Sequence, residues 1–318
     1  MIKLVSWNID RLDELVDLWN RELSEDFPMR KTLFEQNSFQ DRNVCFEASR
    51  IAVDSDNHVV GFIVAKRWQE THEVDMNAET GWIQVLLVDH AYRRHGIGSR
   101  LFEHAETVLK AAGIKEMIFG ADPWHYFPGV PSQYNHSADW VEQKGFKHIV
   151  TAHDFLCEYT GSEAMTIPDM EGVVFRLLDE SEKDEFLDFM HRCFPGRWEY
   201  EAMMYFEKGG TGREFVILKK NGRMIGFCRI NDADSPFIAQ NVYWAPLFED
   251  SLGGLGPLGI DEKERKQGYG LAIVQAGIAH LRQRGIKKIV IDWTVLVDFY
   301  KKLGYDNWKS YDVYKKIF

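Results

Sequence analysis

The chain has 318 residues, a formal net charge of −11 and a hydrophobic fraction of 45%, so it is long enough for two domains with sizeable cores. The negative charge disfavours a nucleic acid as partner, because that binding depends on neutralising phosphates with Lys and Arg. No apolar run reaches the roughly 20 residues that span a bilayer. The four cysteines are far apart and form no CxxC pair, which favours neither a metal site nor a disulfide framework. We therefore expect a cytoplasmic protein with no membrane partner and no metal.

The first half of the chain predicts one set of helices and strands. Residues 9–23 have the apolar spacing of an amphipathic helix, and residues 48–68 have the pattern of two strands joined by a turn. A further strand runs into the stretch RRHGIG at 93–98, which opens a long helix ending near Gly113. A strand at 116–121, a short helix at 138–144 and a final strand complete the set.

The second half predicts the same elements in the same order. A helix is expected at 181–194 with Ser181 as its N-cap, followed by a hairpin at 213–230 whose Asn221-Gly222 pair is a strong turn signal. A strand then enters RKQGYG at 265–270, a long helix follows, and a β-branched strand is expected at 288–294. These patterns predict a mixed α/β fold in which helices cover a largely antiparallel sheet.

The two halves form an internal repeat. Arg93 and Arg265 are 172 residues apart, and so are Gly113 and Gly285. Shorter phrases recur in the same order, such as FPMR at 27–30 and FPGR at 194–197. Repetition at a fixed spacing is typical of a duplicated domain. We therefore predict an N-terminal domain at 1–160, a linker at 161–172 and a C-terminal domain at 173–318.

The repeated glycine turn favours an anion site. A turn that ends a strand and opens a helix directs several backbone N–H groups, and the positive end of the helix dipole, toward one point. A Rossmann fingerprint would need a third glycine where Leu101 and Ile273 stand, and the Gly-Lys-Ser/Thr of a Walker loop is absent. Neither of these two phosphate motifs therefore accounts for the turn.

The phrase Arg/Gln-x-x-Gly-x-Gly between an apolar strand and an amphipathic helix resembles the acetyl-CoA loop of the GNAT family of N-acetyltransferases. The resemblance covers nearly the whole chain and implies two tandem GNAT folds, in a layout similar to that of the mycothiol synthases. It also implies acetyl-CoA as cosubstrate, bound by a strand and a turn in each copy. In the first copy these residues are Leu86 and Val88 on the strand, with Arg94, His95, Gly96, Ile97, Gly98 and Ser99 in the turn. In the second they are Leu258 and Ile260, with Lys266, Gln267, Gly268, Tyr269, Gly270 and Leu271.

The same resemblance implies that the second copy is catalytic. Many GNAT enzymes have a tyrosine on the short last helix that protonates the leaving thiolate, and VDFYKKLGY places Tyr300 there. The first copy has Val141 at this position, which cannot transfer a proton. Thr294 lies where the family often has an Asn that contacts pantetheine. For the general base we name Asp292, with Glu249 and Asp250 as alternatives.

An aromatic loop at 120–136 is a further difference between the two copies. It contains FPGVP and resembles the acetyltransferase-like domains attached to some bacterial hexosaminidases. Asp122, His125, Tyr126 or Tyr134 would supply a different acid or base if catalysis lay in the first copy. The alternative, which we prefer, is a rigid packing loop shaped by its prolines.

Together these features predict an acetyl-CoA-dependent N-acetyltransferase that acts on the primary amine of a small molecule or peptide. The alternative is a non-catalytic acyl-CoA-binding scaffold with two such folds, and Tyr300 favours the enzyme. The sequence leaves the acceptor open. Two GNAT domains in one chain are compatible with a monomer that mimics a dimer, or with a homodimer.

Overall fold

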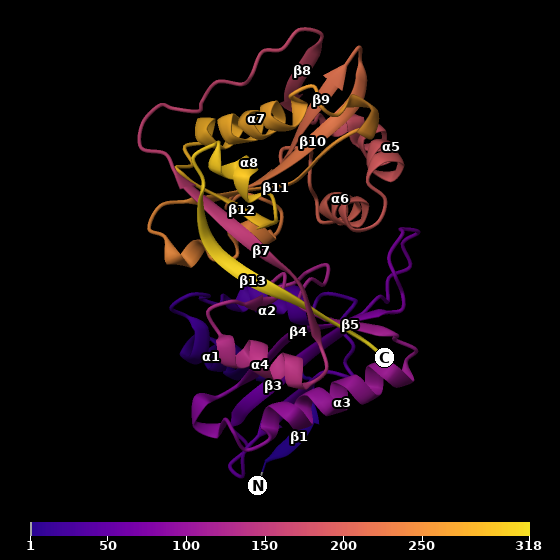
Figure 1. The fold of residues 1–318 in the computed structure, drawn as a ribbon, viewed down its shortest axis with the longest axis vertical. Helices are drawn as coiled ribbons and strands as arrows, with labels where there is room; N and C mark the ends of the chain where they lie inside the picture. The colour runs from indigo at the N-terminus through magenta and orange to yellow at the C-terminus, as the bar shows by residue number, and fades with distance from the viewer. Residues whose placement is uncertain (1) are drawn as a thin grey trace. The chain divides into compact units, whose positions relative to one another are not determined.

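The computed structural model describes residues 2–318 and divides them into two compact units (Figure 1). The first unit contains the residues up to Thr71 together with Asn77–Ala152 and Lys309–Phe318. The second contains His72–Met76 and His153–Trp308. None of the helices in residues 2–318 combines the length and the apolar character that a bilayer crossing requires.

The first unit is built on a mixed sheet with strand order β1-β2-β3-β4-β5-β13-β7. Strands β4 and β5 are parallel, whereas β1 to β4 pair successively in antiparallel fashion and β13 is antiparallel to β5. The short strand β6 (Val130–Pro131) pairs with β13. The bounds are β1 Lys3–Ser6, β2 Arg50–Val53, β3 Val59–Arg67, β4 Thr80–Val88, β5 Glu116–Phe119, β7 Lys147–Glu158 and β13 Asp306–Ile317.

Helices cover both faces of this sheet because successive residues of a strand point to opposite sides. Ile63 of β3 belongs to the core cluster under helix α3, whereas its neighbour Phe62 packs against Trp7 and Phe34 on the side of α2. Helix α3 lies across β3 and β4 (Figure 1). The bounds are α1 Leu12–Leu23, α2 Lys31–Ser38, α3 Ile97–Ala111 and α4 Asn135–Gln143, with 3-10 turns at Ile9–Arg11 and His90–Tyr92.

The second unit repeats this sheet with the order β8-β9-β10-β11-β12-β7-β13. Strands β11 and β12 are parallel, and the pairs β8–β9, β9–β10, β10–β11 and β12–β7 are antiparallel. The bounds are β8 Val173–Leu177, β9 Phe215–Lys220, β10 Arg223–Asn231, β11 Leu252–Ile260 and β12 Lys288–Thr294.

The helices of the second unit also lie on both faces of its sheet (Figure 1). Phe227 of β10 contacts Phe186 and Phe189 of α5, whereas the adjacent Cys228 belongs to the cluster formed with α7. The bounds are α5 Lys183–Cys193, α6 Arg197–Glu207, α7 Tyr269–Gln283 and α8 Val297–Lys301, with 3-10 turns at Glu180–Glu182, Gln240–Val242, Ala245–Leu247 and Glu262–Glu264. This confirms the predicted fold class: two folds, each with a mixed, largely antiparallel sheet flanked by helices.

Strands β7 and β13 each contribute to both units. Residues 147–152 of β7 and 309–317 of β13 belong to the first unit, and residues 153–158 and 306–308 belong to the second. The last strand of each sequence repeat therefore supplies part of the other repeat's sheet. In the second sheet Val290 lies opposite Leu156, and at the equivalent place of the first sheet Ile118 lies opposite Lys315. The sequence limits 1–160, 161–172 and 173–318 remain a prediction about the repeat.

Two local predictions have different outcomes. The hairpin is confirmed, since β9 ends at Lys220 and β10 begins at Arg223, with Asn221 and Gly222 at φ 50° and 78° as a two-residue turn requires. Ser181 is not the N-cap of its helix, and that prediction was wrong. Asp179 caps the 3-10 turn Glu180–Glu182 that leads into α5: its side chain accepts from the Ser181 amide and forms a capping box with Glu182.

Candidate active site

Both glycine turns have the same backbone conformation. Arg94 and Lys266 have φ of 65° and 66°, and Gly96 and Gly268 have φ of 75° and 82°. Helices α3 and α7 begin directly after these glycines. Left-handed residues ahead of a helix N-terminus form a concave set of backbone N–H donors, which suits a phosphate. A Cβ placed on Gly96 or Gly268 would meet no described atom within 4 Å, so the space in front of each glycine is open.

The turn of the second unit opens onto a cavity of about 300 Å³. Five of the eight residues predicted to bind the cosubstrate through this strand and turn line it: Leu258, Ile260, Lys266, Tyr269 and Gly270. Gln267, Gly268 and Leu271 do not line it. The sequence reasoning missed Phe194, Trp198, Glu264 and Arg265, which complete the lining together with Gly259.

The repeated phrase FPGR contains Phe194 and ends at the first residue of α6, so this repeat could have indicated both features. The Phe194 ring lies so close to β11 that a Cβ on Gly259 would be 2.4 Å from its Cζ. Glycine at position 259 is therefore required for the ring to form the wall of the cavity.

The two parallel strands next to the turn separate as they approach it. Strands β11 and β12 pair from Leu252↔Lys288 to Leu255↔Ile291, and β11 then continues to Ile260 without further pairing to β12. The equivalent pairing in the first unit ends at Ile83↔Phe119. A strand edge that parts from its neighbour leaves backbone groups available to an extended ligand. Leu258 and Ile260 lie on this part of β11, and their contact with the cosubstrate stays a prediction.

Asp292 lies where the strands of the second unit separate. Its side chain is half-buried, and its Oδ1 accepts a hydrogen bond from Asn241 Nδ2 at 3.3 Å. The same Asn241 amide donates to the Gly256 carbonyl at 3.2 Å. A Cβ on Gly256 would lie 3.4 Å from Asp292 Oδ1, so the carboxyl group faces the backbone of β11.

Several features of this site oppose ionisation of Asp292. Burial, and then the nearby Asp154 and Glu201 carboxylates, raise the pKa of Asp292 to about 7, against a smaller opposing effect of the Asn241 hydrogen bond. A carboxyl group with this pKa changes its charge near neutral pH. It is therefore matched to proton transfer under those conditions.

Tyr300 is buried on α8 beside Phe155 and Tyr305. Burial, and then the nearby Cys228 and Asp292, raise the pKa of Tyr300 above its ordinary value, so the hydroxyl stays protonated at neutral pH. Within residues 2–318 this hydroxyl has no hydrogen-bond partner. A protonated, uncommitted hydroxyl can donate to a basic atom that enters the site.

The other residues named from the sequence lie elsewhere or have other roles. The Thr294 hydroxyl accepts from the Leu296 amide at 3.0 Å, in the turn that precedes α8. Asp250 lies near Lys287 and Lys288, at the opposite end of β11 and β12 from the separated strands. Neither Asp250 nor its exposed neighbour Glu249 is positioned as an alternative to Asp292.

The first unit has lost the equivalent groups. At the 172-residue spacing Gly120 corresponds to Asp292, and each is followed by a residue in the left-handed region, Ala121 at φ 57° and Trp293 at φ 43°. A Cβ on Gly120 would be 2.2 Å from the Phe127 carbonyl oxygen, so no carboxylate fits there. Val141, buried at the position of Tyr300, adds no proton donor.

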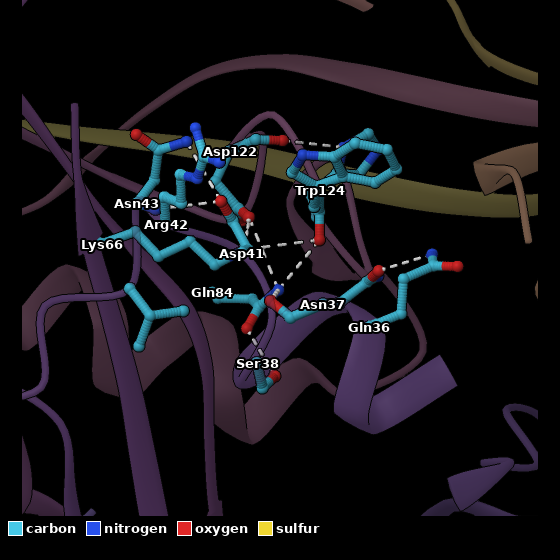
Figure 2. A network of polar contacts seen from close by, with 12 residues as sticks. Gln36, Asn37, Ser38, Asp41, Arg42, Asn43, Lys66, Gln84, Asp122 and Trp124 are labelled. Atoms are coloured by element: carbon cyan, nitrogen blue, oxygen red, sulfur yellow. Dashed lines mark hydrogen bonds and ion pairs between the residues drawn. The ribbon is translucent and has the colours of Figure 1, made fainter. Parts of the chain in front are cut away.

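A buried polar network occupies the equivalent region of the first unit (Figure 2). The Lys66 ammonium group is fully buried and pairs with Asp41 at 2.7 Å and with Asp122 at 2.5 Å. Gln84, which corresponds to Gly256, donates to the carbonyl groups of Trp124 at 2.8 Å and Asn37 at 3.2 Å. These contacts fill the space between strands β4 and β5 with the protein's own groups.

The aromatic loop of the first unit is part of this packing. His125 and Tyr126 are buried, and the Tyr126 hydroxyl is 2.7 Å from the Ser38 hydroxyl. Tyr134 is half-buried, and burial, followed by Asp26, raises its pKa to about 12. Since Asp122 pairs with Lys66, these groups are committed to the fold, which supports the packing role of the loop.

Comparison with known proteins identifies proteins that are similar to this chain in sequence and in structure. The family model described as the acetyltransferase (GNAT) family matches residues 12–125 and 183–305. A mycothiol acetyltransferase from Thermobispora bispora is 26% identical over 168 residues, which are 46% of this chain and 50% of that protein. The chain thus spans about half the length of that curated relative.

Two solved structures extend the similarity to the whole chain. One is a fungal multi-domain GH3 β-N-acetylglucosaminidase with a GCN5-related glucosamine N-acetyltransferase region. It aligns with a TM-score of 0.87 and 25% sequence identity, and the alignment covers 99% of this chain and 38% of that chain. The other is a tandem GNAT protein from the clavulanic acid biosynthesis pathway, with TM-score 0.70, 14% identity, 100% of this chain and 98% of that chain. The second similarity concerns the fold alone.

Proposed function

Since the chain belongs to the acetyltransferase (GNAT) family and has two GNAT domains in tandem, we propose that it acetylates the amine of an amino sugar with acetyl-CoA. The second unit carries out the reaction. The observation that supports this most directly is the pair Asp292 and Tyr300 beside the separated strands, together with its replacement by Gly120 and Val141 in the first unit.

The second unit offers a site that fits acetyl-CoA. The backbone N–H groups after Lys266 and Gly268 suit the pyrophosphate, and the cavity of about 300 Å³ continues from them along Leu258 and Ile260. The open space at Gly268 and Gly270, where a Cβ would meet no described atom within 4 Å, leaves room for close approach of phosphate oxygens. Acetyl-CoA supplies the acetyl group as a thioester, which is the group transferred.

Asp292 acts as general base in this proposal. A sugar amine is mostly protonated near neutral pH and attacks a thioester only after losing a proton. Because the pKa of Asp292 is raised to about 7, the carboxylate is both populated at neutral pH and basic enough to accept that proton. Asn241 fixes the orientation of the carboxyl group by its hydrogen bond at 3.3 Å.

Tyr300 acts as general acid. When the amine nitrogen bonds to the acetyl carbon, it gives up its remaining excess proton to solvent; the carbon–sulfur bond breaks, and the sulfur leaves as a thiolate that needs a proton. The Tyr300 hydroxyl is protonated at neutral pH and is near enough to Asp292 for that charge to affect its pKa. It can donate to the sulfur and be reprotonated from solvent.

Two observations support an amino sugar as acceptor. The region around Asp292 contains two further carboxylates, Asp154 and Glu201, whose negative field attracts a cationic amine. Trp293 follows Asp292 directly and is 37% exposed, with the Arg197 guanidinium 4.6 Å from its ring centroid, so the part of the ring that stays exposed can pack against a pyranose ring. The fungal protein with TM-score 0.87 contains a region described as a glucosamine N-acetyltransferase.

The turn of the first unit is proposed as a second CoA site without catalysis. Its φ values at Arg94 and Gly96, 65° and 75°, are close to those at Lys266 and Gly268, 66° and 82°. The full set is Leu86, Val88, Arg94, His95, Gly96, Ile97, Gly98 and Ser99. The groups around Lys66 fill the space that corresponds to the acetyl end, so productive acetyl transfer is not expected there.

The test is acetyl-CoA-dependent thiol release with a panel of glucosamine, a polyamine, an amino acid and a short peptide. We expect turnover with glucosamine and loss of turnover in Asp292→Asn. The matched change in the first unit is Gln84→Gly, which alters its buried network and should leave kcat within about threefold. No thiol release with any amine, despite CoA binding, would favour the scaffold alternative. Turnover that survives in Asp292→Asn but is lost through changes at Asp122 would move catalysis to the first unit.

A further inference from the structure

The conformation of β12 around Asp292 is irregular. Pairing with β7 runs regularly to Ile291↔Phe155, then shifts and resumes at Thr294↔His153. Trp293 lies within the interruption with φ 43°, in the left-handed region that a bulky side chain rarely adopts. Such strain persists only where the surroundings hold it, and it often occurs at functional sites.

The interruption is held by a carboxylate from the other sequence repeat. The Trp293 amide donates to Asp154 Oδ1 at 3.0 Å, and Asp154 is 5% exposed. Asp154 is on the part of β7 that belongs to the second unit, although β7 is the last strand of the first repeat. The residue that fixes the backbone after Asp292 therefore comes from the exchanged strand.

The first unit shows what the same interruption looks like without a carboxylate. Ala121, the counterpart of Trp293, also has a left-handed φ, but its amide donates to the Phe127 carbonyl at 3.0 Å. The register of the two sheets places Val313 at the position of Asp154. A backbone carbonyl is thus sufficient to hold the interruption, and the carboxylate in the second unit adds a charge that the fold itself does not need.

We propose that Asp154 is a positioning residue for catalysis, which holds Trp293 and thereby Asp292 in place and adds a negative charge beside Asp292. This inference rests on the proposed function of Asp292 as general base. The first repeat takes part in the reaction through this residue of its last strand, independently of any cosubstrate in its own turn.

Charged and titratable groups face Asp292 from several elements. Asp154 on β7 and Glu201 on α6 both oppose its ionisation. The Arg229 guanidinium on β10 is buried and near enough to Asp292 to be influenced by it, and Tyr300 on α8 is similarly influenced. Glu201 is 2.8 Å from Arg197, whose cation balances part of its charge. Removing the Asp154 charge should therefore lower the pKa of Asp292 while Glu201 keeps part of the upward shift.

The experiment compares Asp154→Asn, Asp154→Ala and the control Glu158→Gln in the full chain. Asn keeps an acceptor oxygen for the Trp293 amide and removes the charge, whereas Ala removes both. Glu158 lies on the same strand and pairs with Lys288 at 3.2 Å, away from Asp292, so its variant tests for a general effect of charge on β7. The readouts are the pKa of the Asp292 carboxyl by ¹³C NMR, assigned with Asp292→Asn, and the pH profile of kcat/KM with acetyl-CoA and glucosamine.

We expect Asp154→Asn to lower the pKa of Asp292, and to shift the acidic limb of kcat/KM to lower pH, by about one unit. Asp154→Ala should show this shift and a further fall in kcat of about tenfold or more, since the Trp293 amide loses its acceptor. Glu158→Gln should leave both readouts unchanged. A purely structural role predicts lower thermal stability with no shift in either pH readout.

The outcomes separate this inference from the proposed function. If Asp292→Asn is inactive but Asp154→Asn keeps the wild-type pKa and pH profile, the inference is wrong and the function stands. If no amine is acetylated but the pKa of Asp292 still falls in Asp154→Asn, the proposed function is wrong and the coupling of Asp154 to Asp292 stands. Should Asp154→Ala fail to fold, Asp154→Asn, which retains the acceptor, decides the question.

Discussion

Replacing Asp292 by Asn should abolish activity and at the same time stabilise the protein above neutral pH. The pKa of this carboxyl rises from 3.8 to about 7, so the folded state opposes its ionisation. For a carboxyl with a raised pKa, the unfolded chain ionises first as pH increases. Stability is therefore lost between about pH 4 and pH 7, and the loss stays constant above pH 7.

The magnitude follows from the size of the shift. Three pKa units correspond to about 4 kcal/mol, and partial exposure of the side chain reduces this to roughly 2–4 kcal/mol. Asparagine carries no charge and therefore has no such penalty. Its side-chain oxygen can still accept the hydrogen bond that Asn241 donates to Asp292 at 3.3 Å. For a domain of this size the gain corresponds to a rise in Tm of roughly 4–16 °C at pH 8.

The assay is thermal unfolding of wild type and Asp292→Asn at pH 4, 5, 6, 7 and 8. The difference in Tm should be near zero at pH 4, grow to pH 7 and then level off, while kcat falls about 10²–10⁴-fold as expected for loss of a general base. Asp306→Asn, which removes an exposed carboxylate of the same unit, is the control for the loss of one negative charge. A Tm difference that does not change with pH, or a lower Tm of Asp292→Asn at pH 8, would refute the reasoning.

Further changes test the other features. Tyr300→Phe should lower kcat at least about tenfold with CoA affinity unchanged by calorimetry, whereas Val141→Ala should affect only stability; equal kcat in Tyr300→Phe and wild type would contradict the acid role. Gly268→Glu should abolish binding of one CoA per chain, because it places a carboxylate in front of the α7 N-terminus, and Gly96→Glu should abolish binding of a second CoA. If only one CoA binds per chain, and only Gly268→Glu abolishes it, the first turn binds none. Lys66→Met should destabilise the chain by about 3–5 kcal/mol in urea unfolding, because two buried carboxylates lose their cation, while glucosamine acetylation at 20 °C persists; a cost below about 1 kcal/mol would contradict the pairing.

The features that the sequence predicted depend on short stretches of chain. The glycine turns, the Asn221-Gly222 hairpin and the contrast between Tyr300 and Val141 each follow from a few neighbouring residues whose local geometry is nearly independent of the rest. Asp292 lies on β12, the strand expected from the β-branched residues at 288–294. Its catalytic role stays a prediction.

The features that were missed depend on contacts between distant segments. Lys66 is the penultimate residue of a strand whose other residues are mostly apolar. Its partners Asp41 and Asp122 lie in loops far away in sequence, so no local pattern indicates a buried ion network. Helices α2 and α6 were also missed, because their apolar residues have no clear helical period. The role of Asp154 depends on which sheet β7 joins, and two similar sheet edges cannot be told apart from the strand sequence alone.

The exchange of strand ends has a consequence for synthesis on the ribosome. Domains are usually completed in order as the chain emerges, at about 5–20 residues per second. In the first unit β5 obtains its neighbour β13 only when residues 315–317 have been translated, and Lys315 is 197 residues after its partner Ile118 (315 − 118). Until then β5 is an open strand edge, which is prone to pair with other chains. Ribosome stalling within the second repeat would therefore expose the first repeat to aggregation, because the sheet of the first repeat is completed only by the last strand of the second.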